Sequence, residues 1–166
     1  MSPPITPPAR RYFTALGGLP PQSKTADDKA IFTNAYMLMP HGVMSDIVTS
    51  FLPHWQGMRM WVLARPMTGF AETFSHYLVE LAAGGGSDQT EDDPAAEAVL
   101  FVVGGHLTLT IDGTAHNLRA GGYAYLPPGA QWTIHNNHAA DDDADSNDAK
   151  TAHFHWIRKR YQPVVG

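Results

Sequence analysis

The hydrophobic positions of this chain fall into short runs separated by Gly, Pro and Asp. β-Branched and aromatic residues are frequent in these runs, as they are in β-strands. The runs cover residues 74–81, 99–103, 107–111, 123–126, 132–134 and 153–161, after three apolar pieces between residues 31 and 63. The pattern predicts an all-β domain. In it, the glycines of 84–86 close the strand that begins at Phe74, and Asp112–Gly113 forms a tight hairpin turn because both residues accept a positive φ.

Two segments lack this pattern. Residues 1–30 are rich in Pro and then polar, so we expect an N-terminal arm with little structure of its own, followed by a barrel over 31–166. Residues 138–149 are acidic and aperiodic, which is typical of a mobile surface loop. This loop lacks the order of oxygen ligands, central Gly and terminal Glu of a calcium-binding loop.

Composition narrows the classes of function. The formal net charge is −5, with no cluster of Lys and Arg, so nucleic acid is not an expected partner. The absence of cysteine excludes disulfides and thiolate chemistry. No signal peptide is visible at the start, and no run reaches the roughly 18 apolar residues of a membrane span. These observations predict a cytoplasmic protein.

Two groups of residues with fixed spacing flank the central runs. The first is Gly85, Glu91, Asp93, Glu97 and Gly104, and the second is Gly121, Pro127, Gly129, Trp132 and Asn136. Their order and spacing resemble the two motifs of the cupin family. The resemblance implies a single cupin barrel (a double-stranded β-helix, or jelly roll), with Glu97, Trp132 and Asn136 at interior positions.

The expected metal ligands of that family are replaced here. Cupin motifs supply two His and one Glu, and then a third His, but Glu91 and Asp93 stand at the first two His positions and Trp132 at the third. An indole has no lone pair for a cation, and its bulk would fill the space of a metal ion. Only Glu97 is retained.

Two interpretations of these acidic residues remain open. Glu91, Asp93 and Glu97 would form an oxygen site for a hard cation such as Mn²⁺ or Mg²⁺. Alternatively, the barrel has lost its metal, with Glu91 and Asp93 solvated in an exposed turn and Glu97 paired or hydrogen-bonded. We favour the second, because acidic residues beside Pro in a turn are usually solvated. No catalytic or metal-binding residue is therefore assigned.

The histidines carry no clear ligand pattern. His153 and His155 lie two apart on a strand and share a face, but nothing completes a ligand set, so we expect structural roles. His106, His116, His135 and His138 fall near turns without informative spacing. Neither a Gly-x-Ser-x-Gly elbow nor a phosphate-binding loop is present.

The strand at residues 98–103 has two apolar faces. Ala98, Leu100 and Val102 alternate with Val99, Phe101 and Val103, so both faces should be covered. One face belongs to the barrel interior. We expect the other to contact a second barrel or a partner subunit, which predicts a homo-oligomer or a paired domain.

Several longer stretches resemble one family more closely. Residues 32–81, 96–113, 120–129 and 154–166 are similar to the N-terminal half of the bacterial (S)-ureidoglycine aminohydrolases, two-cupin proteins of allantoin breakdown. The resemblance implies manganese-assisted hydrolysis of ureidoglycine to ureidoglycolate and ammonia. It also implies that the manganese ligands belong to a second cupin half, which would begin beyond Gly166.

Three hypotheses of function follow. The chain is the metal-free half of such an enzyme, or it is a stand-alone metal-free cupin that binds a small polar ligand or acts as a sensor. The third and weakest hypothesis is an independent metalloenzyme that uses Glu91, Asp93 and Glu97.

Overall fold

The computed structural model describes residues 31–33, 36–38, 52–64, 74–137 and 150–161. In these residues the strands are β1 (Ile31–Phe32), β2 (Met37–Leu38), β3 (Trp55–Ala64), β4 (Ser75–Ser87), β5 (Ala96–Gly104), β6 (His106–Ile111), β7 (Thr114–Arg119), β8 (Tyr123–Leu126), β9 (Trp132–His135) and β10 (Ala152–Arg160). The predicted arm at 1–30 and the acidic loop at 138–149 lie outside the described residues. No helix in the described ranges has the length and apolar character needed to cross a membrane.

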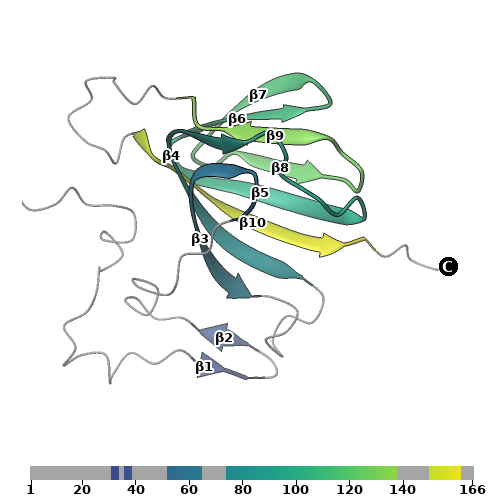
Figure 1. Ribbon diagram of the computed structural model, residues 1–166. Coiled ribbons are helices and arrows are strands. Elements are labelled where there is room, and N and C mark those ends of the chain that lie inside the picture. Colours follow the sequence, from purple (N-terminus) through teal and green to yellow (C-terminus); the bar gives the residue numbers. More distant parts are fainter. Residues whose placement is uncertain (1–30, 34–35, 39–51, 65–73, 138–149, 162–166) are drawn as a thin grey trace, which may run out of the picture.

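Eight strands form one antiparallel sheet that curls into a nearly closed barrel (Figure 1). Their order is β7-β6-β9-β4-β10-β5-β8, and β3 pairs with the other edge of β4, from Ser87 to His76. β1 and β2 pair only with each other. The predicted all-β antiparallel barrel is confirmed.

The core fills the inner side of the barrel. Along β5 the buried side chains are Ala96, Ala98, Leu100 and Val102, every second residue, as a strand with one inward face requires. The centre of the core is Trp156 on β10, which is 1% exposed. Its ring lies beside those of Trp55, Tyr77 and Trp132, with centroid distances of 5.6, 5.4 and 5.9 Å.

β4 does not end at Leu81 as predicted, but continues through the glycines to Ser87. There it pairs with β9, where Gly86 lies opposite His135. A Cβ at Gly86 would come within 2.3 Å of the Ile134 carbonyl oxygen, so no side chain fits at this crossing. The glycines therefore permit close strand approach rather than a turn.

The hairpin between β6 and β7 was predicted only in part. Asp112 and Gly113 have φ values of 47° and 81°, which confirms the tight turn. The strand that follows, β7, was missed because all its side chains except that of Leu118 are exposed, so it carries no apolar alternation.

Asn136 is a buried polar residue that joins two distant segments. Its Nδ2 donates to the carbonyl oxygens of Leu81 (3.1 Å) and Lys150 (2.6 Å). Its backbone exchanges hydrogen bonds with Gly84 and Gly85, both at 2.8 Å. The amide therefore holds the end of β9 against β4 and against the segment that leads into β10.

We expect Asn136→Ala to lower the free energy of unfolding by roughly 2–4 kcal/mol, because one buried and one partly buried carbonyl group lose their donor. Urea denaturation of the purified chain measures this change. The matched control is Asn137→Ala, which removes one exposed hydrogen bond to Thr108 and should cost less than about 1 kcal/mol. Equal losses in the two variants would contradict a structural role specific to Asn136.

Candidate functional site

The loop at residues 88–95 connects β4 to β5 and lies at one end of the barrel. Thr90, only 6% exposed, anchors this loop because its hydroxyl donates to the Trp132 carbonyl oxygen at 2.5 Å. Glu91 and Asp93 accept hydrogen bonds from backbone N–H groups two residues further on, at 2.9 and 3.1 Å. The loop is therefore held in one conformation that fixes the positions of both carboxylates.

Both carboxylates are paired with arginines of β10. Arg158 Nη2 lies 2.5 Å from Glu91 Oε1, and Arg160 Nε lies 2.7 Å from Asp93 Oδ2. The expectation of a simply solvated turn was wrong, since the side chain of Glu91 is only 12% exposed. The hydrogen bond from Arg160, followed by that from the Ala95 N–H, lowers the pKa of Asp93 below its usual value.

Glu97 does not lie in the barrel interior, contrary to the prediction. It alternates with the buried Ala96 and Ala98 and so projects from the outer face of β5. There it accepts a hydrogen bond from the Tyr125 hydroxyl at 2.7 Å and lies 3.3 Å from Lys159 Nζ. The Tyr125 hydrogen bond is the main cause of a lowered pKa of Glu97, and the same contact raises the pKa of Tyr125. The paired Glu97 expected from the sequence is present, but on the other side of the sheet.

These positions do not fit a manganese site. Glu91 faces a guanidinium group, and Glu97 projects from the outer face of β5. Trp132 and Asn136 are buried, but the indole supplies no lone pair. Among the described residues, no three His, Asp or Glu side chains are arranged to hold a metal ion.

Two cavities flank the loop. A cavity of about 340 Å³ is lined by Trp55, Thr90, Glu91, Trp156 and Arg158 with their neighbours. A second, of about 270 Å³, lies on the Trp132 side of the loop. Sequence reasoning missed Trp156, Arg158 and Arg160, although their spacing of two along 153–161 already places them on one strand face.

The histidines of β10 lie on the outer face of the sheet. His153 Nε2 is 3.5 Å from Glu80 Oε2, and Arg59 lies on the other side of the same carboxylate. His155 Nδ1 is 2.8 Å from His76 Nε2, so one ring donates and the other accepts, which requires the accepting ring to be neutral. Burial, and then the charge of His155, lowers the pKa of His76 to about 4, and burial also lowers the pKa of His155. His138 lies outside the described residues.

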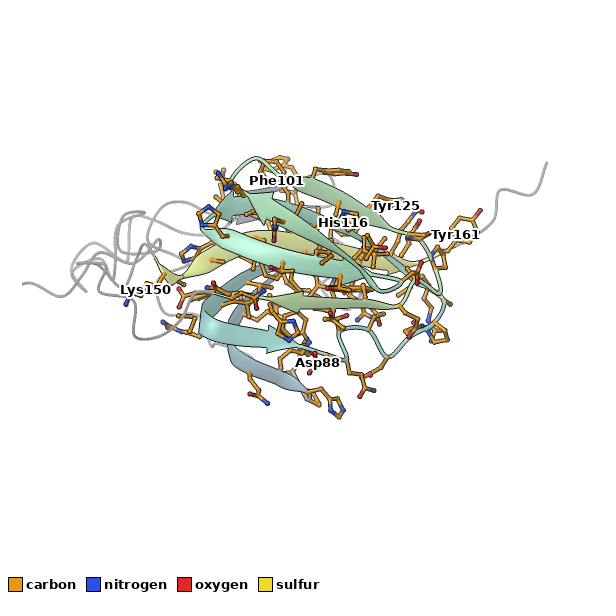
Figure 2. The ribbon with its side chains drawn as sticks, turned by 90° about the horizontal axis from the view of Figure 1, so that it is seen from above. Asp88, Phe101, His116, Tyr125, Lys150 and Tyr161 are labelled. Carbon is orange, nitrogen blue, oxygen red and sulfur yellow. The ribbon has the colours of Figure 1, made fainter. Side chains whose placement is uncertain are left out.

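An apolar patch continues on the outer face beyond these histidines. We call it the outer patch: Val99, Phe101, Tyr123, Tyr125, Ile157 and Tyr161. Register places Phe101 opposite Tyr123 and Val99 opposite both Tyr125 and Ile157. Figure 2 shows Tyr125 and Tyr161 toward the same end of the molecule, away from Lys150. Phe101 is 44% and Tyr123 is 62% exposed, so the second apolar face of β5 is uncovered in the single chain.

The barrel is that of a cupin. The family model described as a cupin domain matches residues 77–143, which confirms the predicted fold. The chain thus contains a cupin domain whose motif positions carry ion-paired acids.

Three longer proteins are similar to most of this chain. It is 30% identical over 133 residues to the (S)-ureidoglycine aminohydrolase of Escherichia coli (strain K12), a match that covers 80% of this chain and 45% of that protein. A solved structure of a putative glyoxylate-induced protein from Pseudomonas aeruginosa is 50% identical, with a TM-score of 0.72, over 97% of this chain and 53% of the other. The protein Ylba from E. coli is 25% identical, with a TM-score of 0.69, over 89% of this chain and 55% of the other. The chain spans about half the length of each of these proteins.

The pair His76–His155 predicts a pH dependence of stability. The folded pKa of His76 lies below the ordinary value of 6.5, so the unfolded chain binds more protons between pH 6.5 and about 4. Stability contributed by the neutral pair is present above pH 6.5 and is lost as the pH falls toward 4. Urea unfolding of the wild-type chain should therefore show a lower free energy at pH 5 than at pH 7. In His76→Gln this difference should shrink, whereas His116→Gln, an exposed change on β7, should leave it unaltered.

Proposed function

We propose that this chain is the non-catalytic, metal-free barrel of a two-barrel enzyme related to (S)-ureidoglycine aminohydrolase. The observation that carries the proposal is the ion pair between Glu91 and Arg158. A guanidinium group 2.5 Å from the carboxylate at the first ligand position repels any metal cation there and uses the oxygen that would bind it.

The length of the relatives supports this proposal. The chain covers 45% of the E. coli aminohydrolase, which leaves room in that protein for a second domain of similar size. The resemblance implies that the second barrel holds manganese and hydrolyses ureidoglycine with release of ammonia. In this proposal the present barrel contributes surface and stability to the assembly.

The outer patch supplies the contact surface. Its aromatic side chains lie on an exposed strand face. Strand faces in contact with solvent are usually polar, so an apolar face of this kind indicates a contact surface. The proposed occupant is a second cupin barrel. When the chain is purified by itself, the occupant available is another copy of the chain, which gives a homo-oligomer.

A second candidate function is a stand-alone cupin that binds a small polar ligand. The 340 Å³ cavity beside Arg158 favours it, because the cavity combines aromatic walls with charged groups.

The first proposal predicts that the purified chain, incubated with Mn²⁺ and dialysed, retains no stoichiometric manganese and releases no ammonia from ureidoglycine. Elemental analysis and an ammonia assay measure the two quantities, and the E. coli aminohydrolase is the positive control. Ammonia release by this chain alone, at a rate comparable to that of the control, would show that it is not a non-catalytic half.

The outer patch predicts self-association. Light scattering of the wild-type chain at micromolar concentration should give a mass of at least two chains. Phe101→Glu should shift it to one chain, because a carboxylate in the interface would be desolvated without a partner. The control is Thr114→Glu, which adds the same charge at an exposed position of β7. A wild-type mass of one chain at this concentration contradicts the proposed surface.

A further inference from the structure

Three buried polar atoms at the mouth of the barrel have no hydrogen-bond partner among the described residues. They are Trp156 Nε1, Arg158 Nε and Glu91 Oε2. All three residues line the 340 Å³ cavity. A buried polar atom left unpaired costs about 1–3 kcal/mol, and buried polar groups in folded proteins are normally hydrogen-bonded. We take three such atoms, in residues that line one cavity, as an indication that these groups bind a ligand.

The two donors are held rigidly. Trp156 is 1% exposed and its ring is packed among three other aromatic rings, so its N–H has one fixed direction. The guanidinium carbon of Arg158 lies 5.7 Å from the centroid of that ring, and its Nη2 is fixed by Glu91. An indole N–H and a guanidinium Nε–H on two neighbouring inward residues of one strand are suited to the two oxygens of one carboxylate.

The charge of the cavity argues against a simple anion. Its lining contains the carboxylates of Glu91, Asp92 and Asp93 and the guanidinium groups of Arg158 and Arg160, an excess of one negative charge. An anion would bind its donors but be repelled by these acids. A ligand that also carries an N–H-bearing cation satisfies the free oxygen of Glu91 and offsets the excess charge.

We propose that this cavity binds a small amino-acid-like zwitterion. Its carboxylate accepts hydrogen bonds from Trp156 Nε1 and Arg158 Nε, and its ammonium group donates to Glu91 Oε2. This inference rests on the second candidate function, whose ligand class it specifies, and it is independent of the assignment to a two-barrel enzyme.

The test is isothermal titration calorimetry of the purified chain with glycine and asparagine. Acetate and methylammonium serve as half-ligands that carry only one of the two charges, and glycerol is the neutral probe. We expect saturable binding of at least one of the two amino acids. Each half-ligand should bind at least about 10-fold more weakly, because it leaves one side of the site unpaired.

Trp156→Phe tests the donor without removing the ring from the core. We expect about a 10-fold loss of affinity for the amino acid that binds, the value of one hydrogen bond. Trp61→Phe is the matched control: it makes the same change on the outer face and should leave binding unaltered. Arg158→Lys, which keeps the charge near Glu91 but removes the Nε donor, should also weaken binding. Thermal unfolding curves establish that each variant is folded.

Several results would overturn the inference. These are no saturable binding of either amino acid by the folded chain, or undiminished binding by Trp156→Phe. If acetate binds as tightly as glycine, the ligand class is a simple carboxylate and the inferred zwitterion is wrong. If only glycerol binds, the inferred zwitterion is wrong but the second candidate function, a cupin that binds a small polar ligand, is still supported. The two failures are therefore distinguishable.

Discussion

β10 is hydrogen-bonded to β4 along one edge and to β5 along the other, and the rest of the barrel depends on this double pairing. Its inward side chains, Phe154 and Trp156, form the centre of the core, while Ile157 lies on the outer face. Because side chains alternate, a slip of one residue in either pairing would exchange the two faces. The burial of Trp156, which is worth a few kcal/mol, selects the register. Once the register is set, Arg158 is placed at the barrel mouth.

The charges at the mouth define the site more than they stabilise the fold. The pair between Arg160 and Asp93 is largely exposed on the arginine side, and such pairs contribute little to stability. The pair between Arg158 and Glu91 is more buried, and removing either partner would leave a poorly solvated charge. Glu91, which stands at a motif position, is thus paired with a fixed cation from the chain itself.

The outer face of the sheet contains both buried and solvent-exposed apolar side chains. Trp61 and Leu78 are covered there, each 3% exposed, whereas the outer patch a few strands away is open. Between the two lie His76 and His155, whose mutual hydrogen bond requires at least the accepting ring to be neutral. The polar groups of this face therefore pair with each other, and its apolar groups remain available for contact.

Particular residues show how far the sequence could predict the structure. The hairpin at Asp112–Gly113 was predictable because its geometry is local. β7 was not predictable, because an edge strand with exposed side chains forms by hydrogen bonding to its neighbouring strand and carries no apolar pattern. The length of β4 was misjudged because a glycine run signals a turn as readily as a close strand crossing. The position of Glu97 in the motif led to the prediction that it lies in the barrel interior. In the structure, every second side chain of β5 is buried, and Glu97 alternates with these and lies on the outer face.

The sequence by itself determined the all-β class, most of the strands and the absence of histidine at the motif positions, because these follow from residue type and short-range spacing. Tertiary structure alone decided which acids face which cations. Glu91 and Arg158 are 67 positions apart in the chain, and only the pairing of β10 with β5 brings them within hydrogen-bond distance. The same pairing collects Trp156, Arg158 and Glu91 around one cavity. Local pattern carries no information about such long-range register, which is set by burial of the whole core.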